Sequence, residues 1–167
     1  MPATYNRIAS TILTSASATI TFSSIPATYT DLRIVLRAIP LNSTGTYNSI
    51  RFNGDTGTNY SLTQILASSG SLASTRYSNT ADLYLNDTDT AGIYPAAATI
   101  DIFSYAGSTF KTLLSVYAGD KNSQGIVCAV VGLWRSTSAI NSVTLNNAAG
   151  NNYQSGTVAT LYGIKAA

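Results

Sequence analysis

Side chains that commonly carry catalysis are scarce in this sequence of 167 residues. It contains no histidine and a single cysteine, Cys128. Without histidine, the chain lacks the base of Ser-His-Asp and Cys-His nucleophile systems, and with it the most common general base near neutral pH. Zinc sites built from cysteine and histidine are excluded for the same reason. We therefore expect a protein that is not an enzyme, with no cofactor and no catalytic or metal-binding residues.

Carboxylates are the remaining candidates, and all seven acidic residues are aspartate. A glycosidase needs only two carboxylates, and the sequence offers Asp87 with Asp89, and Asp55 with Asp31. Asp55, Asp87 and Asp89 lie among Asn, Gly and Thr, where aspartate normally bonds its own backbone in turns. Together with Asn86, the second group could contact Ca²⁺, but that ion needs six to eight oxygen ligands. We interpret these aspartates as turn residues.

The single cysteine excludes an internal disulfide. Cys128 lies in the apolar segment 126–131, which favours a small buried hydrophobic residue over a reactive thiol.

Eleven tyrosines are the strongest positive feature of the sequence. Tyrosine offers a wide contact area and a hydrogen-bonding tip, which suits interfaces between proteins. Tyrosines on loops can also stack on sugars, so glycan binding stays open. Tyr105, Tyr117 and Tyr162, each near an apolar strand, are equally consistent with filling the edge of a core.

Arginines on neighbouring strands form the second candidate contact surface. Arg33, Arg37 and Arg51 could share one outward face and grip an acidic partner, or they could simply be solvated. Together with Tyr5 and Arg7 of the N-terminal segment, they are the residues that we assign to an interface.

The overall charge excludes several classes of partner. Charged residues make up 10% of the chain, against about 25% in typical proteins. The net charge is +2, and the basic residues are scattered singly, so we expect no nucleic acid.

The apolar run Ile126–Trp134 is about half of the roughly 20 residues that span a bilayer, so we expect no membrane partner. The first residues lack the features of a secretion signal, which predicts folding in a cytoplasm.

Strands must hold these residues in place. Glu is absent and Lys occurs only three times, whereas helix surfaces are built mainly from Glu, Lys, Gln and Ala. Apolar and polar residues alternate instead, as in Leu32 to Ala38, where both arginines point away from the leucines. The pattern predicts roughly ten strands, over residues 4–14, 19–23, 32–38, 48–52, 81–86, 99–104, 110–117, 125–135, 139–146 and 157–165.

Two segments deserve separate expectations. Residues 125–135 are almost continuously apolar, which is typical of a central strand covered on both faces. Tyr60 to Ser68 is the one place where a short helix is conceivable.

Many short strands separated by turns predict an all-β, two-sheet antiparallel β-sandwich. Jelly-roll wiring is the commonest viral version, while immunoglobulin-like and C2-like wirings stay open. Residues 15–167 are expected to form a single domain, and residues 1–14 form either an extended N-terminal arm or the first strand.

Three stretches carry a resemblance to a known group. They are Ile20 to Ile34 (ITFSSIPATYTDLRI), Arg51 to Tyr60 (RFNGDTGTNY) and Leu161 to Lys165 (LYGIK). Their pattern of strands and turns resembles small β-sandwich virion structural proteins of tailed bacteriophages, including cyanophages, over about half of the chain.

The resemblance implies a capsid cement or decoration protein. Such a protein would bind the major capsid protein on the outer capsid surface of the virion as a homotrimer and stabilise the shell. The alternative is a tail or baseplate protein that binds host-surface glycans.

Overall fold

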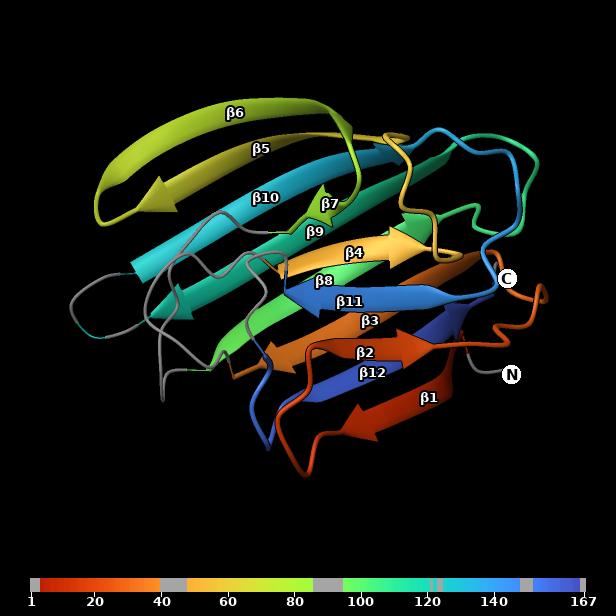
Figure 1. The fold of residues 1–167 in the computed structure, drawn as a ribbon, viewed down its shortest axis with the longest axis horizontal. Coiled ribbons are helices and arrows are strands. Elements are labelled where there is room, and N and C mark those ends of the chain that lie inside the picture. Colours follow the sequence, from red (N-terminus) through yellow and green to blue (C-terminus); the bar gives the residue numbers. More distant parts are fainter. Residues whose placement is uncertain are drawn as a thin grey trace.

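The computed structural model describes residues 4–39, 48–85, 95–120, 122, 125–147 and 152–165. These residues form β-strands and no helix, and the strands belong to two antiparallel sheets that lie face to face (Figure 1). This arrangement confirms the predicted all-β sandwich.

The larger sheet has eight strands, in the order β1 (Tyr5–Ile12), β12 (Val158–Ile164), β3 (Asp31–Ala38), β8 (Ala96–Phe103), β9 (Lys111–Asp120), β10 (Gly125–Trp134), β5 (Tyr60–Ser68) and β6 (Ser71–Thr80). The smaller sheet has four, in the order β2 (Thr19–Phe22), β11 (Val143–Asn147), β4 (Asn48–Phe52) and β7 (Leu83–Tyr84). The chain passes repeatedly between the sheets, while β8, β9 and β10 follow one another in the larger one. A jelly roll has eight strands, so jelly-roll wiring stays a prediction.

The core lies between the two sheets. On β3, Leu32, Ile34 and Leu36 are almost fully buried, and cross-strand pairing continues this row onto β8 and β12. The smaller sheet presents its own apolar row to them, made of Ile20, Phe22, Ile50, Phe52, Val143 and Leu145.

Aromatic side chains connect the sheets near the end of β4. The Trp134 ring lies 5.5 Å from Phe52 and stacks at 6.3 Å on Tyr60, centroid to centroid. The Tyr60 hydroxyl accepts a hydrogen bond from the Phe52 N–H and donates one to the Asp55 carbonyl, each at 3.1 Å. This buried phenol therefore ties the turn after β4 to the larger sheet.

The structure decides two segments for which the sequence left alternatives open. Tyr60–Ser68 is strand β5, paired along its length with β10 and β6, so the short helix is wrong: its inward residues Tyr60 and Leu62 alternate with period two. Residues 5–12 form strand β1 on the edge of the larger sheet, paired with β12.

Gly132 lies where a side chain of the smaller sheet packs closely against the larger sheet. A Cβ atom at this position would lie 2.5 Å from the Leu113 Cδ2 atom and 2.8 Å from the Leu83 Cδ2 atom. Leu83 belongs to β7 of the smaller sheet, so the missing side chain makes room for it.

We expect Gly132→Ala to lower the free energy of unfolding by about 1–3 kcal/mol, because the core must shift to admit a methyl group. Urea denaturation measures the change. Ala73→Val, which adds carbon atoms at an exposed position of β6, is the control and should stay within about 0.5 kcal/mol of the parent protein. Equal stability of the Gly132 variant would contradict this packing.

Buried tyrosines make the fold sensitive to alkali. Burial raises the pKa of Tyr60, Tyr105 and Tyr153 above the usual value, which is about 10. The folded state therefore keeps these protons after the unfolded chain has lost them. Their contribution to stability is complete below about pH 10 and is lost as the pH rises from there. Burial lowers the pKa of Lys111, which acts in the opposite sense, but it is one group against three.

We expect the free energy of unfolding, measured by urea denaturation, to fall as the pH rises above about 10, by up to about 1.4 kcal/mol per pH unit for each buried phenol. Tyr153→Phe should make this slope shallower. A midpoint that is constant up to pH 11 would show that the three hydroxyls are accessible to solvent.

Candidate functional site

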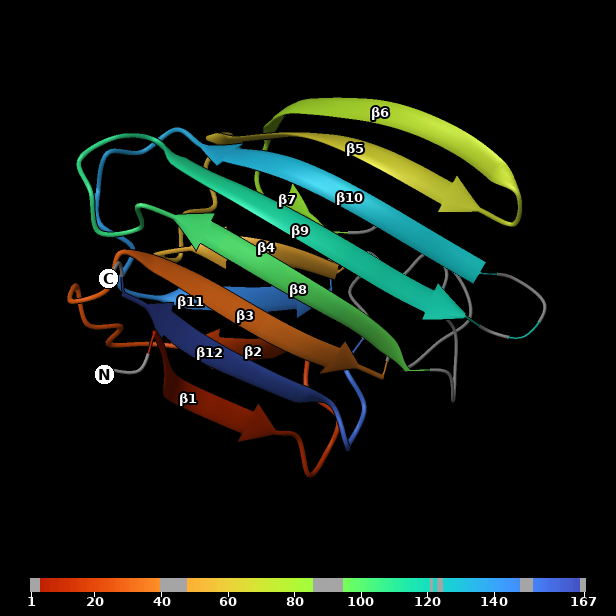
Figure 2. The same ribbon diagram turned by 180° about the vertical axis from the view of Figure 1, so that it is seen from behind.

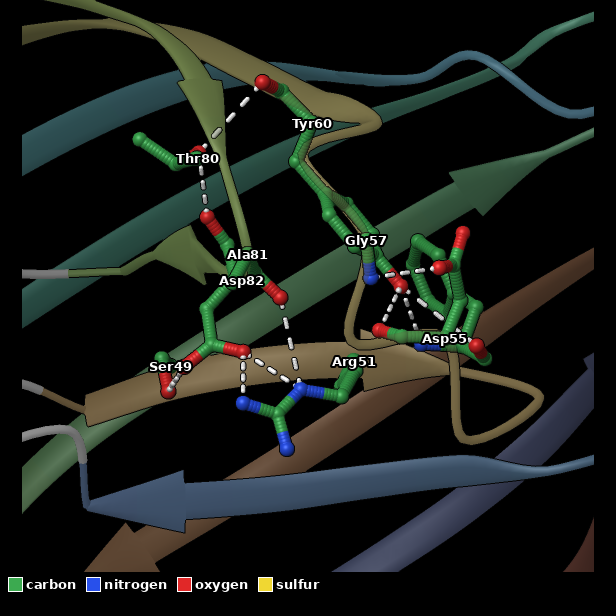
Figure 3. Close-up of polar contacts among 9 residues, drawn as sticks. Ser49, Arg51, Asp55, Gly57, Tyr60, Thr80, Ala81 and Asp82 are labelled. Atoms are coloured by element: carbon green, nitrogen blue, oxygen red, sulfur yellow. Dashed lines mark hydrogen bonds and ion pairs between the residues drawn. The ribbon is translucent and has the colours of Figure 1, made fainter.

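Asp55 is held as a turn anchor. Its carboxylate accepts hydrogen bonds from the Gly57 N–H at 2.8 Å, the Asn59 side chain at 2.9 Å and the Trp134 Nε1–H at 2.7 Å. Burial alone would raise the pKa of Asp55, but these three donors lower it below its usual value. The ionised carboxylate, with two donors from its own loop and one from Trp134, fixes the loop, and a turn role is what the sequence predicts. Figure 3 shows Asp55 beside its Gly57 donor.

The other candidate carboxylates do not extend this site. Asp31 accepts a hydrogen bond from the Ser104 N–H at 2.7 Å, so it anchors a different loop from Asp55. Asp87 and Asp89 lie outside the described residues. Within the described part of the chain, no three acidic or cysteine side chains gather as metal ligands.

Arg51 lies in the smaller sheet, away from Arg33 and Arg37. It forms an ion pair with Asp82, with its Nε atom 2.5 Å from the carboxylate, and the Ser49 hydroxyl donates to the same carboxylate at 3.3 Å. Figure 3 shows Arg51 extended along the sheet towards Asp82. The expectation that all three arginines share one face is therefore wrong, because β4 and β3 belong to different sheets.

The remaining interface candidates meet on the outer face of the larger sheet, which is the side directed away from the smaller sheet. The Arg33 guanidinium holds the Asp101 carboxylate with two contacts, at 2.5 and 2.8 Å, and donates to the Tyr5 hydroxyl at 2.9 Å. Cross-strand pairing sets Arg7 opposite Tyr162, and Tyr162 opposite Arg33. Arg37 lies on the same side of β3 and donates to the Gly156 carbonyl.

The centre of this outer face is apolar, which the sequence analysis missed. Large aliphatic side chains stand exposed along the middle strands, and alanines fill the positions between them. We call this surface the aliphatic patch; it comprises Val35, Ile65, Ala67, Ala97, Leu114, Val116, Ala118, Val127, Ala129 and Val131.

The members of the patch are neighbours across five strands. One row runs from Val35 through Thr99, Val116 and Ala129 to Ile65, each opposite the next. Val116 is 48% exposed and Ile65 is 55% exposed. Figure 2 shows the larger sheet from this side, with the smaller sheet behind it.

The expectation that residues 125–135 form a strand covered on both faces is wrong for the isolated chain. One face of β10 packs in the core, whereas Val127 and Val131 on the other face are 56% and 49% exposed. The sequence held the signal that could have located the patch. A two-layer sandwich covers each sheet once, so a strand that is apolar on both sides leaves one apolar face exposed.

A hollow lies at one end of the patch. It has a volume of about 640 Å³ and opens over the row of Ala97, Ala118 and Ala67. Arg37 lines one side and Val127 another. Small side chains on four adjacent strands produce this depression, and larger apolar groups could enter it.

The smaller sheet has the opposite character. Its outward side carries Thr19, Thr21, Thr144 and Asn146, and the hydroxyls of Thr21 and Thr144 lie 3.2 Å apart. The protein therefore has one polar side and one side with an apolar centre.

Comparisons with protein-family models, with curated proteins and with solved structures found no match. No helix of the described residues is long and apolar enough to cross a membrane. The geometry of the chain must therefore carry the functional argument.

Arg51 and Asp82 provide a test of a structural role. Arg51→Met leaves Asp82, which is only 8% exposed, without its cation. We expect a loss of about 1–3 kcal/mol in the free energy of unfolding. Adding Asp82→Asn should recover part of the loss, because the unpaired charge is gone. A double-mutant cycle measures this coupling, and strictly additive losses would contradict it.

Proposed function

We propose that the chain is a non-enzymatic structural subunit of a tailed-phage particle, a capsid cement protein that binds the major capsid protein on the outer surface of the shell. One observation carries the structural role: the aliphatic patch on the outer face of the larger sheet, which suits a subunit that works through contacts between proteins. A monomer rarely leaves so continuous an apolar surface in water, and such surfaces normally mark protein contacts.

The scaffold suits a purely mechanical role. Eight paired strands make a broad platform, and partly buried polar side chains serve as anchors for loops. Asp55 and Asp31 bond backbone groups, and Arg33 is neutralised by Asp101. A protein of this kind works by buried area and shape fit, with about 1,600 Å² covered at a standard contact.

The phage setting comes from the resemblance of the three sequence stretches, and the homotrimer and the jelly-roll class come with it. In this proposal the trimer bridges neighbouring capsid subunits at a symmetry axis of the shell and resists internal pressure from DNA. Tyr5, Arg7, Arg33 and Arg37 belong to the contact side of the subunit, and Arg51 does not.

The glycan-binding alternative requires exposed tyrosines. Among the described residues, Tyr60, Tyr105, Tyr117 and Tyr153 are buried, and only Tyr5 exposes more than a third of its surface. These positions favour the structural proposal over a tail protein that stacks its tyrosines on sugars.

Immunogold labelling of intact virions tests the proposal. We expect label distributed over the capsid of particles from the phage that encodes the chain. Label confined to the tail, together with a specific signal of the purified protein on a glycan array, would establish the alternative. Virions without label would contradict both.

A further inference from the structure

We propose that the aliphatic patch is covered by a second copy of this chain, so that the protein is a homo-oligomer before it meets any other partner. This inference deepens the proposed function and rests on it for the purpose of the assembly. The contact between copies needs no capsid protein, so the purified chain alone tests it.

The size of the surface supports a stable contact. Strands β3, β8, β9, β10 and β5 lie side by side and contain eight to ten residues each. With about 4.8 Å between strands and about 3.3 Å per residue, the outer face of five strands of eight residues measures roughly 600 Å² in the sheet plane. The ten residues of the aliphatic patch occupy about half of its outward positions. With side-chain relief, this whole face is on the order of the 800 Å² that each partner contributes to a standard interface, with the patch as the apolar centre and polar residues around it.

The composition of the patch favours another copy over a transient partner. Interfaces between unlike proteins that also exist apart are about as polar as the rest of the surface, whereas homo-oligomer interfaces are more apolar, and charge is depleted from their centre. The central row from Val35 to Ile65 contains only aliphatic residues and one threonine.

The ion pair beside the central row needs nothing from a partner. Arg33 and Asp101 flank the central row on β3 and β8, and they already neutralise each other with two contacts. The patch therefore presents an apolar surface with an internally satisfied ion pair beside it. An uncharged apolar surface of another subunit can cover this pair without leaving a buried charge unpaired. Arg37, which lines the hollow and donates to the Gly156 carbonyl, lies at the border of the contact.

The low charge of the chain also favours a second copy as the molecule that covers the patch. Charged residues make up only 10% of the chain, so little charge is available to keep an exposed apolar sheet dispersed. The partner that is present at synthesis, in equal number and in the same place, is a second copy. The alanine hollow at one end of the patch and the exposed valines at the other give that copy relief to interlock with.

Mass measurement with two matched variants tests the inference. Multi-angle light scattering of the purified chain should give a molar mass that is a multiple of 17.5 kDa. This mass should fall on dilution, as the oligomer dissociates. Val116→Glu places a carboxylate at the centre of the patch and should raise the dissociation constant a hundredfold or more, on the order expected for an unpaired charge in an interface. Thr21→Glu, at an exposed position on the smaller sheet, should leave the mass unchanged.

A thiol probe keeps the test valid if Val116→Glu fails to fold. Cys128 is fully buried, so Val116→Cys creates one reactive thiol on the patch. A maleimide should label it slowly in the oligomer and rapidly after dilution, whereas Thr21→Cys should react rapidly in both states.

Several outcomes would overturn the inference. A wild-type chain that stays monomeric throughout the micromolar range would do so, and so would an oligomer that survives Val116→Glu or leaves Val116→Cys fully reactive. An oligomer held by the patch, combined with unlabelled virions, would retain this inference and contradict the phage proposal. A monomer that labels capsids would do the reverse.

Discussion

The structure depends on one constraint: a two-layer sandwich of unequal sheets covers only one side of the larger sheet. Four short strands pack against eight long ones, and the core forms where they overlap. Side chains alternate across every strand, so half of the residues of β8, β9 and β10 face away from that core. In β9 the outward residues include Leu114 and Val116, while the polar Lys111 and Ser115 point inward. This distribution of polar and apolar residues fits the proposal that the outer side is buried in a larger assembly.

Most of the strands could be predicted from the sequence because their alternation is strong. Leu32 to Ala38 shows it clearly, and there the inward and outward residues lie as predicted. The hairpin of β5 and β6 was missed because Ser71–Thr80 is polar almost throughout and pairs on one edge only. Such a strand lacks alternating apolar residues, so its sequence does not show the period of two that predicts a strand. The sheet to which a strand belongs was also beyond prediction, since Arg51 and Arg33 sit in similar local patterns and are separated only by topology.

The candidate site, like the fold, has parts that the sequence predicts and parts that it does not. The turn role of Asp55 follows from its Asn-Gly-Asp context, and the structure adds the Trp134 donor, which comes from a residue 79 positions away. The aliphatic patch was hidden because residues 125–135 read as a doubly buried strand. That prediction and the two-layer prediction conflict within one chain. A third layer from outside the chain removes the conflict, and the exposed side of β10 is where that layer would lie.

The edges of the larger sheet explain why contact through its face is favoured over strand addition. An open edge pairs readily with other chains unless charge or irregularity blocks it. At one edge, β1 carries Arg7 and a register shift between Arg7 and Ala9, and a bulge of this kind twists a strand out of pairing. At the other edge, β6 carries Arg76 among serines and threonines. Both edges are therefore poor templates for a further strand, whereas the centre of the face between them is aliphatic and is not covered by the described residues. The proposed association therefore uses the face, because the two edges are unfavourable for pairing.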